Sequence, residues 1–290
     1  MKLEKASPCK VNLLLNILGK RPDGFHELET LFHPVAVHDE MSFARAGQGI
    51  QLTCSDPSLP TDHRNLAYRA AELFLRGTKI KEGVRVRLEK RIPLAAGLGG
   101  GSSNAATTLL GLNELFGRPL GMDKLQLIAA FLGSDVPFFL QSNPALATGR
   151  GEQVQSLDFF PALKGTVFLL VHPGFGIATP WAYQNLARFP AALNGQPGRA
   201  RQLVSHLQAG DLKTAGSELY NSLEAPALEK YPLLGMFQEF LRANGAAAAL
   251  MSGSGSTTFA IVEGQAAAET LAEKFKARFG QSNWMALAPV

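Results

Sequence analysis

Residues 93–110 read PLAAGLGGGSSNAATTLL and place four glycines within the five positions from Gly97 to Gly101. Glycine adopts left-handed backbone conformations and lets main-chain amides approach a ligand closely. A helix-forming run follows directly, and the first N–H groups of a helix, at the positive end of its dipole, bind anions. The stretch therefore predicts a phosphate-binding loop at the N-terminus of a helix.

The sequence on either side of the glycines has the pattern of ordered structure. Upstream, residues 84–89 alternate apolar and charged side chains, which is the period of a strand with one buried face, and Pro93 ends that strand. Downstream, apolar residues from Ala105 to Phe116 follow helical spacing until Gly117. The order strand, loop, helix favours a phosphate cradle, while a solvated hinge is the alternative that glycine content alone leaves open.

The loop matches none of three common nucleotide-binding patterns. A Walker A loop requires lysine after its last glycine, and no lysine lies between the glycines and Asn113. The dinucleotide pattern requires a further glycine where Ser102 and Ser103 stand, and the protein kinase motifs His-Arg-Asp and Asp-Phe-Gly do not occur in the sequence. The loop must therefore obtain positive charge from a metal ion or from elsewhere in the fold, and Lys10 and Lys90 are the candidates.

The segment resembles the phosphate loop of the GHMP kinases, which reads roughly Pro-x-x-x-Gly-Leu-Gly-x-Ser-Ser-x-Ala, with one additional glycine here. Five more segments resemble that family in the right order: SPCKVNLLLNILGKRPDGFHELETLF, LGSDVPFFL, HPGFGIATPWAY, NSLEAPALEKYP and LMSGSGSTTFAIV. Phe25 stands where the family has tyrosine, and Ser256 and Thr258 depart from its usual Gly-Ser-Gly-Pro-Thr-Val. Because these segments span nearly the whole chain, it is identified as a member of the family.

The resemblance implies an α+β, two-lobed GHMP kinase fold. Its N-terminal lobe would be an α/β lobe of the ribosomal S5 domain 2-like type, and its C-terminal lobe would be ferredoxin-like. We place the ATP-binding lobe in residues 1–160 and the C-terminal lobe in residues 161–290. At 290 residues the whole chain has a length at which a single hydrophobic core begins to divide. A stretch rich in glycine, proline, arginine and asparagine, Phe189 to Arg201, is predicted to be a flexible insertion.

The resemblance also implies phosphorylation of an alcohol by ATP with Mg²⁺. The additional glycine resembles the branch that phosphorylates the 2-hydroxyl of 4-diphosphocytidyl-2-C-methyl-D-erythritol in the methylerythritol phosphate route of isoprenoid (terpenoid) biosynthesis. Such a transfer needs a proton acceptor and positive charge, which the family pattern places at Asp135 and Lys10. From the residues alone, Asp135 would more often cap a turn and Lys10 would be a solvated strand end.

Binding residues follow from the same resemblance. Gly253 to Gly255 are expected to pack against the phosphate loop, and the protein ligands of the metal are unknown, although Ser103 could supply one. Without the resemblance, Asn65 would be a helix N-cap and His26 a surface histidine. ATP is expected at Asn65, Lys90, Pro93, Leu94, Ala95, Ala96, Gly97, Leu98, Gly99, Gly100, Gly101, Ser102 and Ser103. The acceptor, with its cytosine and methylerythritol parts, is expected at Asn12, Phe25, His26 and Tyr183.

Composition fits a small-molecule enzyme. The formal net charge of +4 could indicate nucleic-acid binding, but charged residues make up only 18% and no long basic run occurs. We therefore predict no nucleic-acid partner, and an RNA-binding module whose loop grips backbone phosphates is the remote alternative. The nearer alternative is a GHMP kinase that acts on mevalonate, homoserine or a sugar.

Two cysteines, Cys9 and Cys54, indicate neither a disulfide framework nor a zinc site. The sequence has no signal-peptide pattern and no apolar stretch near the ~20 residues that span a bilayer. We predict a cytoplasmic monomer or homodimer without a membrane partner.

Overall fold

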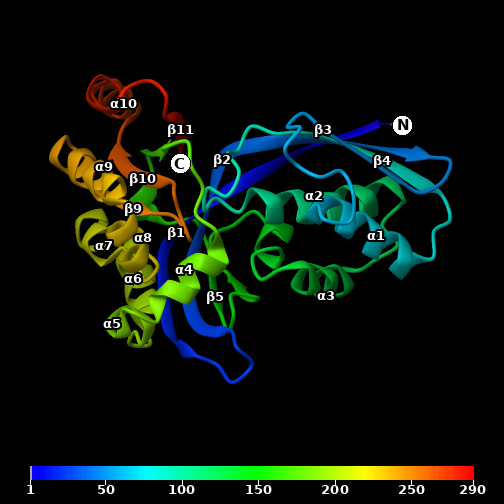
Figure 1. Ribbon diagram of the computed structural model, residues 1–290, viewed down its shortest axis with the longest axis horizontal. Coiled ribbons are helices and arrows are strands. Elements are labelled where there is room, and N and C mark those ends of the chain that lie inside the picture. Colours follow the sequence, from blue (N-terminus) through cyan, green and yellow to red (C-terminus); the bar gives the residue numbers. More distant parts are fainter. Residues whose placement is uncertain (1) are drawn as a thin grey trace. The chain divides into compact units, whose positions relative to one another are not determined.

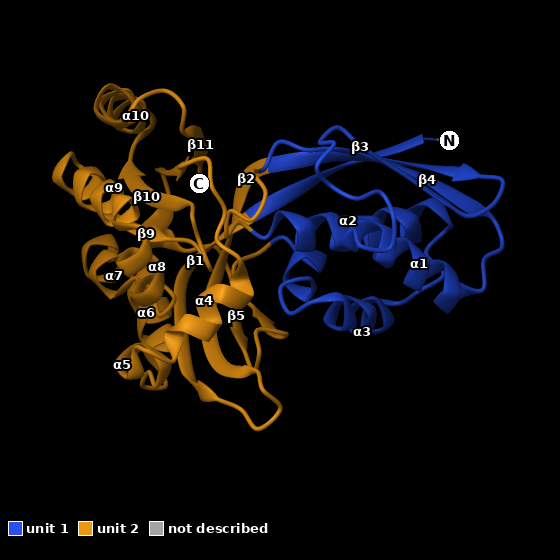
Figure 2. Ribbon diagram, in the orientation of Figure 1, with its two compact units in different colours: residues 1–9, 38–92, 99–142 blue, residues 10–37, 93–98, 143–290 orange. Residues whose placement is uncertain are grey.

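The structure is a computed structural model that describes residues 2–290 as two compact units (Figure 2). Unit 1 takes its residues from 1–9, 38–92 and 99–142, and unit 2 comprises residues 10–37, 93–98 and 143–290. The long strands β1 (Lys2–Lys20) and β2 (His26–Ala46) each contribute to both units. The compact units therefore do not follow a single division at residue 160, which stays a prediction about the lobes.

Unit 1 contains one sheet, in which the order of neighbouring strands is β3-β4-β2-β1. Strand β4 (Gly83–Glu89) pairs antiparallel with β2 and parallel with β3 (Ile50–Cys54). The predicted strand before the glycine segment is thus confirmed, and its alternation has the expected cause, because three apolar side chains enter the core: Val84, Val86 and Leu88.

Helices cover one face of this sheet (Figure 1). They are α1 (Leu66–Thr78), α2 (Gly100–Leu115) and α3 (Met122–Leu132), followed by the 3-10 helix η1 (Pro137–Leu140). Helix α2 lies close against the sheet, since a Cβ added at Gly111 would lie 2.6 Å from the ring of Phe43 on β2. The central position of α2 fixes the last three glycines of the segment, Gly99 to Gly101, to the core of unit 1.

Unit 2 contains its own part of β1 and β2. There β1 pairs in parallel with the short strand β8 (Tyr220–Asn221), and β2 pairs with β5 (Ala145–Thr148), which in turn pairs with β6 (Gln153–Ser156). Helices α4 (Thr179–Leu186) and α8 (Glu224–Lys230) pack against this part around Leu15, Ile17 and Leu223.

A second sheet of unit 2 has the strand order β11-β7-β10-β9. Its strands are β7 (Thr166–His172), β9 (Ala248–Met251), β10 (Thr258–Glu263) and β11 (Trp284–Pro289), and β7 follows the 3-10 helix η2 (Pro161–Leu163). Helices α9 (Pro232–Ala243) and α10 (Gln265–Phe279) share a core with one face of this sheet (Figure 1). Apart from residues 173–231, which are inserted between β7 and α9, the order β7-α9-β9-β10-α10-β11 is the βαββαβ arrangement of the ferredoxin-like fold.

The segment that we expected to be a flexible insertion is anchored within unit 2. It forms α5 (Pro190–Leu193) and leads into α6 (Arg199–Gln208), with α7 (Leu212–Glu218) after it. The Glu29 carboxylate accepts hydrogen bonds from the N–H groups of Gly198 and Ala200, at 3.0 and 3.2 Å, and so caps α6. Among the described residues, no helix combines the length and apolar character that a membrane crossing requires.

Candidate functional site

The glycine segment turns the chain into α2 as the sequence predicts. Gly97 and Gly99 have φ values of +77° and +71°, which favour glycine, and Gly99 is the N-cap of α2. No side chain caps this end, and its first turn carries no acidic residue. The first N–H groups of a helix have no partner within the helix, so this terminus is suited to an anion.

The two ends of the glycine segment differ in their surroundings. A Cβ added at Gly97 would lie 2.0 Å from the carbonyl oxygen of Ser252, so the protein itself requires glycine there. A Cβ added at Gly101 would meet no atom closer than Leu66 Cδ1 at 3.8 Å, and Gly101 is exposed. The open space beside Gly101, at an uncapped helix start, fits a phosphate group.

The Gly253 to Gly255 turn packs against the phosphate loop, as expected. Ser252 Oγ donates to the Gly97 carbonyl oxygen at 3.0 Å, and the Thr257 N–H donates to the Ala96 carbonyl oxygen at 3.1 Å. Asn221 Nδ2 supports the turn by donating to the Gly253 carbonyl oxygen at 2.7 Å. This turn therefore fixes the first half of the phosphate loop within unit 2.

Lys10 and Asn12 lie beside that first half. Lys10 is only 3% exposed, and its ammonium donates to Asn12 Oδ1 and to the Gly97 carbonyl oxygen, the latter at 3.2 Å. Asn12 Nδ2 donates to Thr30 Oγ1 at 2.8 Å. Lys10 is thus buried, in contrast to a solvated strand end, and the structure brings it together with Asn12 and the loop.

Asp135 belongs to unit 1. It lies half-buried in the turn between α3 and η1, where the Val136 N–H donates to the Gly133 carbonyl oxygen at 3.2 Å. The turn position agrees with the reading from the residues alone. Its role as proton acceptor stays a prediction.

The other residues expected at ATP also belong to unit 1 and have structural partners there. Asn65 is the N-cap of α1 and accepts from the Ala67 N–H at 2.9 Å, which confirms the predicted cap. The Lys90 ammonium forms a buried ion pair with Asp39. Ser103 is fully buried and Ser102 only half-buried, so Ser102 is the more accessible of the two serines. Their contacts with ATP stay predictions.

Three aromatic residues of unit 2 were expected at the cytosine. The ring centroids of His26 and Tyr183 lie 5.0 Å apart. The Phe25 side chain is 51% exposed, which suits a stacking surface. Burial, and secondly the charge of Lys20, lowers the pKa of His26 below its usual value. The neutral imidazole that results carries one donor and one acceptor.

Sequence reasoning missed Arg150. Its guanidinium carbon lies 4.6 Å from the centroid of the Phe25 ring and so covers one face of that ring. The residue lies in a turn in which Gly149 and Gly151 have φ values of +70° and +102°, and the Gly149 carbonyl oxygen accepts from the Leu28 N–H at 2.9 Å. The Gly-Arg-Gly-Glu pattern signals the turn, but its partner Phe25 is far away in sequence.

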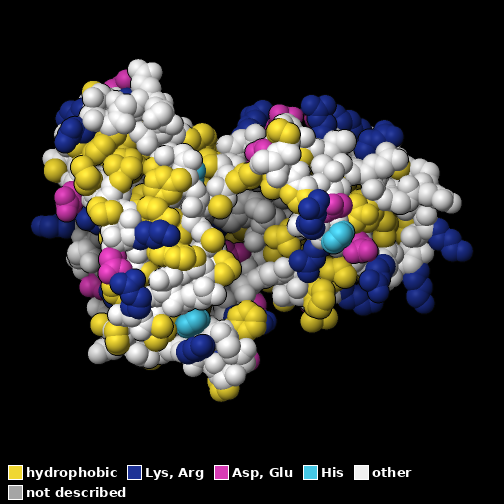
Figure 3. Space-filling model, viewed as in Figure 1, with side chains coloured by type: hydrophobic (Ala, Val, Ile, Leu, Met, Phe, Trp, Pro, Cys, Tyr) yellow, Lys and Arg dark blue, Asp and Glu magenta, His cyan; other side chains and the backbone are white. Residues whose placement is uncertain are grey.

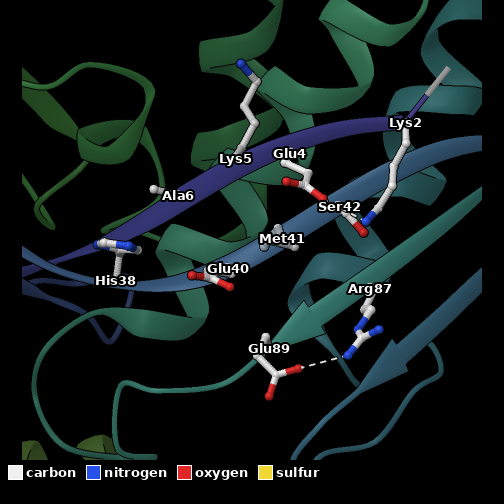
Figure 4. A pocket seen from close by; sticks show the side chains of 10 residues that line it. All are labelled: Lys2, Glu4, Lys5, Ala6, His38, Glu40, Met41, Ser42, Arg87 and Glu89. Carbon is white, nitrogen blue, oxygen red and sulfur yellow. Dashed lines mark hydrogen bonds and ion pairs between the residues drawn. The ribbon is translucent and has the colours of Figure 1, made fainter.

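A hollow of about 380 Å³ also lies on unit 1, along β1, β2 and β4 (Figure 4). Its acidic and basic side chains are already neutralised in pairs: Lys2 with Glu4 at 2.7 Å, Arg87 with Glu89 at 3.4 Å, Lys5 with Glu114 at 2.7 Å, and Glu40 with Arg91 at 2.8 Å. We therefore assign the site to the glycine segment.

Known proteins match this chain over most of its length. The family models described as GHMP kinases N terminal domain and GHMP kinases C terminal match residues 65–143 and 203–281. A 4-diphosphocytidyl-2-C-methyl-D-erythritol kinase of Synechococcus sp. (strain JA-3-3Ab) is 43% identical, with 88% of this chain and 83% of the relative covered. The kinase of the same name from Geobacter sp. (strain M21) is 39% identical, with 99% and 98% covered.

Solved structures agree. A crystal structure of 4-(cytidine 5'-diphospho)-2C-methyl-D-erythritol kinase matches with a TM-score of 0.81 at 36% identity, covering 99% of this chain and 100% of that one. A homoserine kinase from Cytophaga hutchinsonii, at 20% identity and a TM-score of 0.78, covers 100% and 95% and shows the shared fold alone. The predicted two-lobed fold is confirmed, and the chain belongs to the 4-diphosphocytidyl-2-C-methyl-D-erythritol kinase family of the GHMP kinases.

Proposed function

We infer that the protein transfers the terminal phosphoryl group of ATP to the 2-hydroxyl of 4-diphosphocytidyl-2-C-methyl-D-erythritol, within isoprenoid biosynthesis. The names of relatives that match nearly the whole chain support this reaction. The observation that carries it is the uncapped start of α2, where the space beside Gly101 is left open by the protein. That space and the helix N–H groups suit the phosphates of ATP.

The donor end consists of the glycines and the first turn of α2. Their N–H groups hold the phosphate oxygens, and the helix dipole favours the negative charge. Magnesium, when bound, would neutralise part of the negative charge of the phosphates. Ser102, the more accessible of the two serines, is the residue that we propose to reach the phosphates or the metal.

The chemical step requires that the acceptor hydroxyl lose its proton as its oxygen bonds to the γ-phosphorus. We assign the proton to the Asp135 carboxylate, and the bond between the γ-phosphorus and the β,γ-bridging oxygen breaks to leave ADP. The Lys10 ammonium stabilises the charge that develops on the attacking oxygen. Its bonds to Asn12 and to the Gly97 carbonyl oxygen hold it in one place beside the loop.

The acceptor end consists of Phe25, His26 and Tyr183, with Asn12 near the methylerythritol part. Aromatic faces stack on a nucleobase, and the loss of the tyrosine hydroxyl at Phe25 leaves that ability intact. The lowered pKa of His26 keeps its imidazole neutral near pH 7, so that it can pair with the edge of cytosine. Arg150 braces the Phe25 ring from one side.

The two alternative functions, another small-molecule kinase and an RNA-binding module, would require different features of the site and the surface. A kinase for mevalonate, homoserine or a sugar would use the same donor end, but its acceptor has no base for the aromatic residues to stack on. An RNA-binding module would use a continuous basic surface. On the face drawn in Figure 3, basic side chains of unit 1 are interspersed with apolar, acidic and uncharged groups.

The experiment is an ADP-release assay with the cytidyl acceptor beside mevalonate, homoserine and galactose. We expect turnover with the cytidyl acceptor alone, and a loss of about 10²- to 10⁴-fold in kcat for Asp135→Asn and for Lys10→Met. ATP binding should largely persist in Asp135→Asn. Asp123→Asn, an acidic residue in the first turn of α3, is the matched control and should behave like the parent.

Equal turnover in the parent, Asp135→Asn and Lys10→Met would remove the assigned roles. Turnover on another alcohol would favour a different kinase of the fold. Salt-sensitive RNA binding with no ATP consumption would favour the RNA-binding module.

A further inference from the structure

A fully buried carboxylate in unit 1 contacts both flanks of the glycine segment. Asp39, on β2, is 0% exposed and forms an ion pair with the Lys90 ammonium. Its oxygens also accept from Asn104 Nδ2 at 2.9 Å and from the N–H groups of Arg91 and Ile92 at 2.7 and 2.9 Å. A buried charge is costly unless it is paired and hydrogen-bonded, and both conditions are met here.

The partners of Asp39 lie at two places in the chain. Arg91 and Ile92 directly precede the phosphate loop, whereas Asn104 lies in the first turns of α2, just after the glycines. Because one carboxylate binds both, it fixes the distance between the two flanks of the segment. Lys90 adds a contact with the helix start, since its ammonium donates to Asn104 Oδ1 at 3.4 Å.

The same carboxylate sets the orientation of the Asn104 amide within a chain of hydrogen bonds. An ionised carboxylate only accepts, so the amide nitrogen of Asn104 must face Asp39. The second N–H of that amide then donates to Ser7 Oγ at 2.9 Å. The Ser7 and Ser103 hydroxyls share a further hydrogen bond, with 2.8 Å between their Oγ atoms, in which either hydroxyl can donate. The first turns of α2 are thereby tied to β1 and β2 by side chains that are all buried.

We propose that Asp39 is a positioning residue for the nucleotide, which acts through Asn104, Ser7 and Ser103 and does not touch ATP. The proposal rests on ATP binding at the start of α2, as inferred above. A loop held in its binding geometry before the ligand arrives saves the entropy of ordering it during binding. Loss of the network should therefore weaken nucleotide binding and leave the acceptor end, built from unit 2, unchanged.

The test combines three variants with two measurements. Asp39→Asn removes the charge, Asn104→Leu removes the relay, and Ser7→Ala removes one link in it. We expect the Kd for ATP with Mg²⁺, measured by titration calorimetry without acceptor, to rise about tenfold for Asp39→Asn and Asn104→Leu and about threefold for Ser7→Ala. In the ADP-release assay, KM for ATP should rise equally, with kcat and the acceptor KM within about twofold of the parent.

The matched control is Thr108→Val, which removes another buried hydroxyl of α2. Thr108 Oγ1 donates to the Asn104 carbonyl oxygen at 2.7 Å. It takes no part in the hydrogen bonds that link the side chains of Asp39, Asn104, Ser7 and Ser103. It should leave the Kd for ATP unchanged. Asp39→Asn leaves Lys90 buried and unpaired. If this variant does not fold for that reason, Asn104→Leu and Ser7→Ala decide whether the network positions the nucleotide.

The positioning role is overturned if folded Asn104→Leu and Ser7→Ala bind ATP like the parent. It is equally overturned if Thr108→Val weakens binding as much, or if kcat and the acceptor KM change as much as KM for ATP. Failure of the proposed acceptor shows differently, because the parent would then bind ATP in the titration without turnover of the cytidyl substrate. A parent that does not bind ATP would overturn both.

Discussion

The two ends of the glycine segment, Gly97 and Gly101, look alike in sequence but differ in what occupies the space beside them. At Gly97 the polypeptide itself fills the space that a side chain would need, with Ser252 O 2.0 Å from a Cβ position. At Gly101 the nearest atom to that position is 3.8 Å away. A glycine required by packing supports the fold, and a glycine beside open space at a helix start supports a ligand. One motif therefore meets two separate physical demands.

The largest expected effect breaks the packing end. Gly97→Ala places a methyl group against a main-chain carbonyl and forces alanine to adopt a φ of +77°. We expect a loss of about 4 kcal/mol or more in the free energy of unfolding, measured by urea denaturation. Gly24→Ala is the control, because its φ is +86° and no atom lies within 4 Å, so it reports the backbone strain alone. Equal losses in both variants would contradict the packing argument.

A smaller effect on the free energy of unfolding is expected in unit 2 when the pH is lowered, and it involves neither Gly97 nor Gly101. Burial among phenylalanine rings lowers the pKa of His33 to about 4. The hydrogen bond to the Pro34 carbonyl oxygen raises this pKa and so offsets part of the effect of burial. The imidazole is therefore neutral in the fold, whereas the unfolded chain takes up a proton below about pH 6.5. Stability is lost as pH falls through this range.

Between about pH 7.5 and pH 5 the parent should lose about 2 kcal/mol of unfolding free energy through His33. The measurement is urea denaturation of the parent and of His33→Leu at both pH values, because the difference between them isolates this residue from the other histidines. If the free energy of unfolding of His33→Leu falls with pH as steeply as that of the parent, the buried imidazole is not the cause.

The smallest effect tests the ligand end. Gly101→Ala should fold with unfolding free energy within about 1 kcal/mol of the parent, because the added methyl meets open space and alanine suits a helix. The same methyl intrudes on the phosphates, and we expect KM for ATP to rise about tenfold, which corresponds to about 1.4 kcal/mol. Unchanged KM in a folded variant would mean that Gly101 serves no ligand, and the comparison between the two ends would fail.

Local sequence patterns predicted much of the fold. The alternation before Pro93 predicted β4, the spacing after the glycines predicted α2, and Asn65 marked the start of α1. These signals depend on the period of a strand or helix and on bonds to the next few residues, so they can be read without knowing the tertiary structure. The order of motifs along the chain predicted the family.

The predicted roles of site residues are a different matter, since their contacts depend on distant segments. Asp39 stands in a strand pattern with no signal of its own, and its partners Lys90 and Asn104 are 51 and 65 residues away. Arg150 meets Phe25 only through a turn that its glycines shape, and the insertion near Gly198 is anchored by Glu29 at a separation of 169 residues. None of these pairings has a local signature.

The sequence by itself determined where the strands and helices lie, where a phosphate loop begins, and to which family the chain belongs, because each rests on spacing within short windows. The tertiary structure alone decided which glycine is held by packing, which lysine pairs with a buried carboxylate, and which serine stays accessible. The physical reason is that burial and charge pairing depend on which remote segments the core brings into contact.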